Sequence, residues 1–98
     1  MYVEHTDEQG KRLRIWEGHP ESLMHTFIEE KFRDDYPLLN GIELYQDTYF
    51  NTKQISRLIE ELRRFKGELD LQVHDEVDSL IDFSKKIDMH GYLRFVGD

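Results

Sequence analysis

The stretch Asn51-Thr-Lys-Gln-Ile-Ser-Arg-Leu-Ile-Glu-Glu-Leu-Arg-Arg-Phe-Lys-Gly67 has the clearest folding signal in this chain of 98 residues. Its apolar residues recur at steps of three and four, which is the spacing of one helix face. They are Ile55, Leu58, Ile59, Leu62 and Phe65. Asn51 or Thr52 can cap the start, and Gly67 favours a stop. The sequence therefore predicts an amphipathic helix that buries one face.

Two further helices are expected, one before and one after this helix in the sequence. The first begins at Pro20-Glu-Ser22 and ends at Asp34-Asp35, before a proline. Its apolar residues are Leu23, Met24, Phe27, Ile28 and Phe32. The other follows Gly67 and ends at His90-Gly91. Its apolar face consists of Val73, Val77, Leu80, Ile81, Ser84 and Ile87.

Residues 2–6 and 11–17 are predicted to be strands joined by Asp7-Glu-Gln-Gly10, a loop that suits a hairpin. In the second strand, Leu13 and Ile15 alternate with charged or aromatic neighbours, so we expect these two side chains on the buried face. Arg12, Arg14 and Trp16 are expected on the solvent-exposed face.

Residues 38–50 are apolar and aromatic without helical phase, and a short strand or a packed loop is expected around Ile42, Leu44 and Tyr45. Residues 92–96 are expected to form a closing strand. The order β-β-α-(β)-α-α-β predicts an α+β fold: a small, mainly antiparallel sheet (the N-terminal hairpin plus the C-terminal strand) packed against about three helices. No repeat or linker divides the chain, so a single domain over residues 1–98 is expected.

Composition and charge limit the classes of partner and of chemical site that this chain can have. The 21 acidic residues outnumber the 13 basic ones, so the net charge is −8 and the pI is near 5.0. Nucleic acid and anionic lipid repel such a domain, so neither nucleic acid nor a membrane is expected as a partner, and a basic protein is favoured. Cysteine is absent, which excludes disulfides, thiolate metal sites and cysteine nucleophiles. Without a signal-peptide pattern or a long apolar run, a cytoplasmic location is expected.

No motif in the sequence predicts an enzyme. The five histidines lack the helical spacing of a zinc protease, and neither a Gly-rich phosphate loop nor a G-x-S-x-G turn is present. We therefore expect no catalytic residue, no metal and no cofactor. A small carboxylate- or metal-dependent hydrolase that uses grouped acids and His74 or His90 is kept as an alternative.

The stretch from Glu68 to Asp82 contains six acids and no Lys or Arg. Carboxylates three or four residues apart on a helix repel one another, and a docked cation would relieve this repulsion. One interpretation is a solvated face that keeps the domain soluble; the other is a surface for a basic partner. Under the second interpretation, the partner-binding acids are Glu68, Asp70, Asp75, Glu76, Asp78 and Asp82.

The stretch before the central helix combines aromatic side chains with Asp47. Tyr45 and Tyr49 can serve as aromatic anchors at a protein interface, as can Trp16, which is expected to be exposed. Asp47, Tyr45, Tyr49 and Trp16 complete the predicted partner-binding set. The alternative is that Asp47 and Asn51 satisfy backbone donors around the helix start while the aromatic rings cover the core.

The segment Asp47-Thr-Tyr-Phe-Asn51, together with the chain end Tyr92-Leu-Arg-Phe-Val-Gly-Asp98, resembles a family of small, mostly uncharacterised bacterial proteins. Its members share a D-T-x-F-N turn and a C-terminal strand that ends in G-D. Some of them resemble immunity proteins of contact-dependent growth inhibition or polymorphic toxin systems. The resemblance covers residues 41–65 and 90–98 and implies no catalytic residue.

Size, charge and this resemblance together predict an immunity (antitoxin) protein. We expect it to bind a cognate basic toxin domain, a nuclease in the first instance, and to occlude the active site through acidic surface contacts. A non-enzymatic adaptor or an oligomer subunit of a bacterial complex is the alternative, and the oligomeric state is left open.

Overall fold

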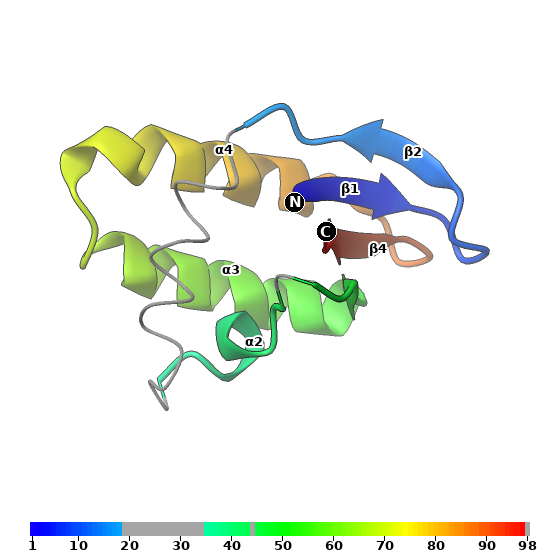
Figure 1. The fold of residues 1–98 in the computed structure, drawn as a ribbon, viewed down its shortest axis with the longest axis horizontal. Helices are drawn as coiled ribbons and strands as arrows, with labels where there is room; N and C mark the ends of the chain where they lie inside the picture. Colours follow the sequence, from blue (N-terminus) through cyan, green and yellow to red (C-terminus); the bar gives the residue numbers. More distant parts are fainter. Residues whose placement is uncertain (19–34, 44, 98) are drawn as a thin grey trace.

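The structure is a computed structural model that describes residues 1–18, 35–43 and 45–97. Its elements are the strands β1 (Tyr2–Thr6), β2 (Arg12–Ile15), β3 (Thr48–Phe50) and β4 (Tyr92–Val96), the α-helices α2 (Pro37–Asn40), α3 (Thr52–Lys66) and α4 (His74–Lys85), and the 3-10 helix η1 (Leu71–Val73). The strands form one antiparallel sheet in the order β2-β1-β4-β3, and α3 and α4 lie side by side next to it (Figure 1). The predicted α+β fold, with an N-terminal hairpin and about three helices, is confirmed.

The central helix α3 forms where its capping signals predict. The Asn51 side chain accepts a hydrogen bond from the Gln54 backbone N–H at 2.9 Å, and the Gln54 side chain accepts one from the Asn51 N–H at 2.9 Å. This reciprocal capping box satisfies two backbone donors at the start of the helix. All five apolar residues predicted for its inner face are buried, and Gly67 ends the helix.

Of the two alternatives expected around Ile42 and Tyr45, a short strand or a packed loop, the structure has the loop at Ile42. A strand forms only later, at β3, and the short helix α2, which was not expected, comes before the loop. Ile42 is buried in a loop, Tyr45 is exposed, and Leu44 lies outside the described residues. Pro37 accounts for the short helix, because its fixed φ suits a first helical turn.

A carboxylate from α3 holds the start of α2. Glu61 is only 4% exposed, and its oxygens accept hydrogen bonds from the backbone N–H groups of Leu38 (3.1 and 3.2 Å) and Leu39 (3.1 Å). The first turn of a helix leaves such amides without an intrahelical partner. One side chain therefore joins the two helices, and its hydrogen bonds offset the cost of burying its charge.

The predicted faces of β2 are wrong. Leu13 and Ile15 are 52% and 43% exposed, whereas the Arg14 guanidinium lies 4.4 Å from the centroid of the Phe83 ring and Trp16 is buried. A bulge in the hairpin shifts the register between β1 and β2, which interrupts the strict alternation of faces. Arg14 and Trp16 also have enough apolar surface to pack against α4, so these side chains are not fully solvent-exposed despite their polar groups.

The helix α4 has the predicted apolar face but ends earlier than predicted. Four of the six apolar-face positions belong to the helix and are buried: Val77, Leu80, Ile81 and Ser84. The helix stops at Lys85, and not at His90-Gly91, because a turn in which the Gly91 N–H donates to the Asp88 carbonyl at 3.0 Å leads into β4. The helix predicted over residues 20–34 lies outside the described residues.

The core lies between the helices and one face of the sheet. Phe50 of β3 meets Phe95 of β4 edge to face, with ring centroids 5.8 Å apart. Side chains with no exposed area surround this pair: Val3, Leu58, Leu62, Val77, Leu80 and Leu93. The other face of the sheet carries Glu4, Arg94 and Tyr49, which stand opposite one another in register. None of the described helices is long and apolar enough to cross a membrane.

Candidate functional site

Three of the predicted acids form a line along the exposed side of α4. Asp75, Asp78 and Asp82 follow one another at steps of three and four residues, so their side chains lie on one helix face. All three are exposed, and we call them the acidic ridge. They border a groove of about 420 Å³ between α4 and the end of β2, the α4 groove, which Trp16 and two basic side chains also line.

Trp16 lines this groove but does not project from it. The side chain is 5% exposed, and its Nε1 donates a hydrogen bond of 2.9 Å to the Ser79 hydroxyl on α4. The expectation that Trp16 is an exposed aromatic anchor is therefore wrong. The indole instead holds the end of β2 against α4, because a buried indole N–H needs an acceptor.

A lysine from the neighbouring helix neutralises part of the acidic ridge. Lys66 of α3 places its Nζ 2.8 and 2.9 Å from the two carboxylate oxygens of Asp78. The repulsion expected among the carboxylates of α4 is thus reduced at Asp78. Asp75 and Asp82 carry the charge of the ridge that this lysine does not contact.

The remaining predicted acids and Tyr45 lie apart from the ridge. Glu68 follows α3 and accepts a hydrogen bond from the Tyr36 hydroxyl at 2.6 Å. Asp70 is exposed just before η1, and Glu76 is half-buried on a different side of α4. Tyr45 is 78% exposed in the loop before β3. The predicted set therefore does not form one surface.

Asp47 and Tyr49 lie around Arg94 on the sheet face opposite the core. Arg94 donates one hydrogen bond to Asp47 and another, of 2.9 Å, to Glu4, while its guanidinium lies 5.3 Å from the centroid of the Tyr49 ring. The bond from Arg94, aided by one from the Gly97 N–H at 3.1 Å, holds the pKa of Asp47 below its ordinary value. Asp47 thus satisfies a backbone donor, as the alternative interpretation has it, but at the end of β4 and not at the helix start.

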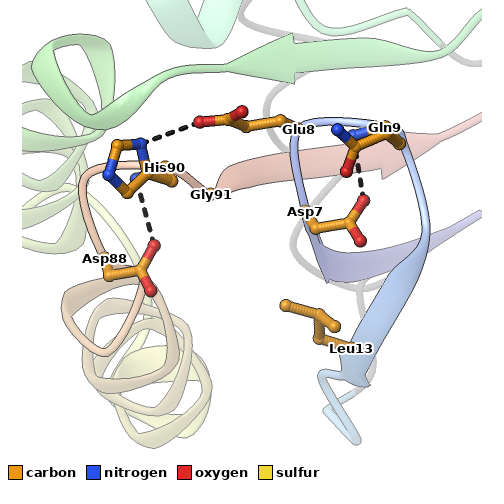
Figure 2. Close-up of a pocket in the computed structure, with 7 residues that line it drawn as sticks. All are labelled: Asp7, Glu8, Gln9, Leu13, Asp88, His90 and Gly91. Atoms are coloured by element: carbon orange, nitrogen blue, oxygen red, sulfur yellow. Dashed lines mark hydrogen bonds and ion pairs between the residues drawn. The ribbon is translucent and has the colours of Figure 1, made fainter.

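The structure also contains a hollow that the sequence did not predict, which we call the hairpin pocket. It has a volume of about 450 Å³ and lies between the loop that joins β1 to β2 and the loop that joins α4 to β4 (Figure 2). Its lining residues are Asp7, Glu8, Gln9, Leu13, Asp88, His90 and Gly91.

His90 connects the two loops of the hairpin pocket. Its Nδ1 lies 2.8 Å from a Glu8 carboxylate oxygen, and its backbone N–H donates to Asp88 at 3.0 Å (Figure 2). On the hairpin side, Asp7 accepts two backbone N–H groups of its own loop at 3.0 and 2.8 Å, which fixes the turn. The lining of the pocket therefore includes three carboxylates and one imidazole, of which Glu8 contacts the imidazole, and Leu13 adds apolar surface. Such a lining suits a cationic group with an apolar stem.

The positions of the histidines give less support to the hydrolase alternative than to a binding site. His74 lies at the opposite end of α4 from His90, with its Nε2 3.1 Å from the Leu69 carbonyl oxygen. The two histidines of the hydrolase interpretation therefore do not share a site. Within residues 1–18, 35–43 and 45–97, no group of three His, Cys, Asp or Glu side chains is placed to hold a metal ion.

Strand pairing explains why the hairpin pocket was missed. β1 and β4 are antiparallel, and Thr6 stands opposite Tyr92, so the residues just after β1 lie beside those just before β4. Asp7 and Glu8 thereby meet His90, although the two segments are at opposite ends of the sequence. The sequence signal for this site is the pairing of the first and last strands, which local residue spacing does not indicate.

The structure brings Asp75, Asp78 and Asp82 together with Trp16, and separately brings Asp47 together with Tyr49. The resemblance to a family of small bacterial proteins stays a prediction. No protein-family model, no curated protein and no solved structure matches this chain.

Proposed function

We propose that this chain is an immunity protein that binds a basic toxin domain, a nuclease in the first instance, and blocks its active site. The observation that carries the proposal is the acidic ridge, in which Asp75, Asp78 and Asp82 lie exposed along one side of α4. Nucleases use Lys and Arg to hold phosphates, so a row of carboxylates can occupy the place of the nucleic-acid backbone. The net charge of −8 adds long-range attraction for a basic partner.

The carboxylates of the ridge are expected to contribute unequally. Asp78 already binds Lys66, so a cation of the partner gains less there than at the two flanking positions. Asp75 and Asp82 are both exposed and border the same groove, so they can accept two separate cations. We therefore expect the largest losses of affinity on reversing Asp75 or Asp82.

The hairpin pocket supports the same kind of partner. Both hollows involve β2 and the residue after it, since Leu13 lines the hairpin pocket and Arg14 and Trp16 line the α4 groove. A Lys or Arg side chain of the toxin can pack its stem on the exposed Leu13 and direct its charge to Asp88. The two hollows together give a binding surface longer than the ridge alone.

The first test asks whether the reading frame immediately upstream encodes a protein with a basic C-terminal domain, as the proposal expects, and uses that domain as the partner. Purified together, the two domains should form a complex in which the toxin is inactive and whose association rate falls steeply with salt. Asp75→Lys and Asp82→Lys should each weaken binding by about tenfold, mainly through slower association. Glu60→Lys, which makes the same change in charge on the exposed side of α3, is the matched control and should change affinity little.

Three outcomes would contradict the proposal. Equal affinity of Asp82→Lys and Glu60→Lys would remove the ridge from the interface. A toxin that stays active in the complex would exclude occlusion of its active site. Turnover of a substrate by the purified chain alone would favour the hydrolase alternative instead.

An adaptor or oligomer subunit is the second candidate, and one observation favours it. Tyr2, Ile15 and Tyr49 are all more than two-fifths exposed, and their positions in the strand register place them on the sheet face opposite the core. Exposed apolar and aromatic side chains that share a face are typical of protein interfaces. Sedimentation at rising protein concentration tests the homodimer: a doubled mass without a toxin would support it, and a constant monomer mass would exclude the homodimer.

A further inference from the structure

His5 is a titratable side chain on the face of β1 that packs against the helix layer. It stands opposite Arg14 of β2 and Leu93 of β4 in the strand register, and its ring is only 7% exposed. The loop between α4 and β4 lies directly against the ring, because a Cβ at Gly91 would be 2.7 Å from its Nε2. That Nε2 has no hydrogen-bond partner within the described chain, so the ring depends on its other nitrogen for a polar contact.

The contact between His5 and Arg14 needs a neutral imidazole. The Nε of Arg14 donates a hydrogen bond to the Nδ1 of His5, with the two nitrogens 3.2 Å apart. A guanidinium has only donors and keeps its charge, so Nδ1 can accept this bond only while it has no proton. Protonation of His5 places a second N–H and a second positive charge at the same contact. The hydrogen bond is then lost, and the two side chains repel each other.

Arg14 is also part of the wall of the α4 groove. Its guanidinium lies 4.4 Å from the centroid of the Phe83 ring, and one terminal nitrogen donates to the Phe83 carbonyl at 3.3 Å. Asp82 of the acidic ridge lines the same groove. The Arg14 side chain is half-buried on a strand at the edge of the described sheet, so it can turn toward water when a contact is lost. The protonation state of His5 therefore affects the shape and the charge of this groove.

Two charged groups act on the His5 ring from the elements packed against it in the described chain. Arg14 on β2 disfavours the imidazolium, whereas Asp88, in the loop that Figure 2 shows beside Gly91, favours it. Leu93, opposite His5 on β4, has no charge. Burial has the largest effect, and together with Arg14 it lowers the pKa of His5 from 6.5. The contact is therefore complete at neutral pH and is broken only in mild acid.

We propose that His5 is a positioning residue that makes the α4 groove sensitive to pH. While its ring is neutral, it holds Arg14 against Phe83. When the ring takes up a proton, Arg14 leaves Phe83, and its guanidinium becomes a mobile positive charge in the groove that Asp82 also lines. The effect on a partner rests on the proposed function: the new charge on His5 and the released guanidinium weaken the attraction of the acidic ridge for a basic toxin domain. The change in the groove itself requires no toxin.

The groove is tested by an NMR titration of the whole chain without a toxin, from about pH 8 to about pH 5. The ring signals of His5 give its midpoint, and the Nε–H of Arg14 and the indole N–H of Trp16, the single tryptophan, report on the groove. At the midpoint of His5, the Arg14 signal should lose its shift from the Phe83 ring and exchange faster with water, while the amide spectrum stays that of a folded chain. A protonated His5 that leaves the Arg14 signal unchanged would overturn the proposal. A ring that stays neutral until the chain unfolds would overturn it as well.

Two substitutions beside the ring should move the midpoint of His5 in opposite directions. Arg14→Gln removes a positive charge and should raise the midpoint. Asp88→Asn removes a negative charge, keeps an acceptor for the His90 backbone N–H, and should lower it. Arg57→Gln removes an exposed arginine of α3 and is the matched control, which should keep the midpoint of the parent. Equal midpoints in Arg14→Gln and Arg57→Gln would contradict the contact between His5 and Arg14.

His5→Gln separates the regulation from the binding of a partner. Glutamine keeps an acceptor for Arg14 and does not titrate, so the Arg14 signal should stay constant over the same pH range. With the basic domain of the proposed function, the affinity of the parent relative to that of His5→Gln should fall by about fivefold from about pH 8 to about pH 5. An equal pH dependence of the two chains would overturn the regulation and leave the proposed function standing. An Arg14 signal that responds to pH in a chain that binds no basic domain would contradict the proposed function and support the pH-sensitive groove. Neither the titration of the parent nor that of Arg14→Gln depends on the folding of His5→Gln.

Discussion

The Nε1 of Trp16 donates a hydrogen bond of 2.9 Å to the Oγ of Ser79, and this bond joins the end of β2 to α4 across 63 positions of the chain. β2 is at the edge of the sheet, where it pairs with β1 alone among the described strands. The Trp16 bond and the contact of Arg14 with Phe83 therefore hold the outer strand against the helix layer. The same two contacts build one wall of the α4 groove.

Ser79→Ala should destabilise the fold by leaving the indole N–H of Trp16 without its acceptor. The expected loss in the free energy of unfolding is about 1 kcal/mol, since Trp16 is buried. Urea denaturation measures it. Ser56→Ala is the matched control: Ser56 also lies inside a helix but is exposed, so that variant keeps the gain in helix propensity and loses no tertiary bond. Equal stability of the two variants would contradict the role of Ser79.

Glu61→Ala should release the start of α2 from α3. The variant leaves the backbone N–H groups of Leu38 and Leu39 without their acceptor, and we expect a loss of about 2 kcal/mol in the free energy of unfolding, because the lost bonds go to a buried carboxylate. Amide hydrogen exchange should show the Leu39 N–H exchanging faster than in the parent. Glu60→Ala, one position away and exposed, should leave both measurements nearly unchanged.

Thr6→Val should stabilise the fold. The hydroxyl of Thr6 is buried without a hydrogen-bond partner in the described chain, so its removal should raise the free energy of unfolding by about 1 kcal/mol. Thr48→Val, in another strand of the same sheet, is the control, since its side chain is half-buried and is not among the buried unpartnered atoms. A chain destabilised by Thr6→Val would mean that the hydroxyl has a partner in solution.

The fold was predictable where several local signals agree. In α3 the apolar spacing, the Asn51 cap and the Gly67 stop all indicate the same helix, and the structure has it. In β2, by contrast, the alternation of Leu13 and Arg14 gave the wrong faces. A bulge and the affinity of a guanidinium for the Phe83 ring decide the orientation there, and both depend on tertiary contacts.

The candidate site was predictable only in part. The spacing of Asp75, Asp78 and Asp82 is a local property of one helix, so the sequence indicates their shared face. The ion pair of Asp78 with Lys66 depends on how α3 packs against α4, and sequence spacing does not report it. The hairpin pocket depends in the same way on which strands pair.

Acid should weaken the fold through Asp47. Its hydrogen bond from Arg94, aided by the Gly97 amide, lowers its pKa, and the same bond raises that of Arg94. The folded state therefore favours the carboxylate, so this contribution to stability is complete above about pH 4 and is lost as the pH falls through the folded pKa. Urea titrations from neutral to acid pH should show this loss in the parent. Asp47→Asn should be less stable at neutral pH and less sensitive to acid; an unchanged slope would contradict the pairing.

Mild acid should act through a different residue, His5 on β1. Its ring is 7% exposed, and its Nδ1 accepts a hydrogen bond from Arg14 at 3.2 Å, which places the ring proton on Nε2. That Nε2 is buried with no hydrogen-bond partner in the described chain. Burial, followed by the charge of Arg14, lowers the pKa of His5 from 6.5, and Asp88 opposes the shift.

Because the pKa of His5 is lower in the folded chain, the unfolded chain takes up the proton first as the pH falls. The His5 contribution to stability should therefore be complete above pH 6.5 and decline below it, until the folded ring is protonated as well. His5→Gln keeps an acceptor for Arg14 but does not titrate, so it should remove this part of the slope in urea titrations between about pH 8 and about pH 5. Identical slopes for the parent and His5→Gln would show that His5 does not control the response to mild acid.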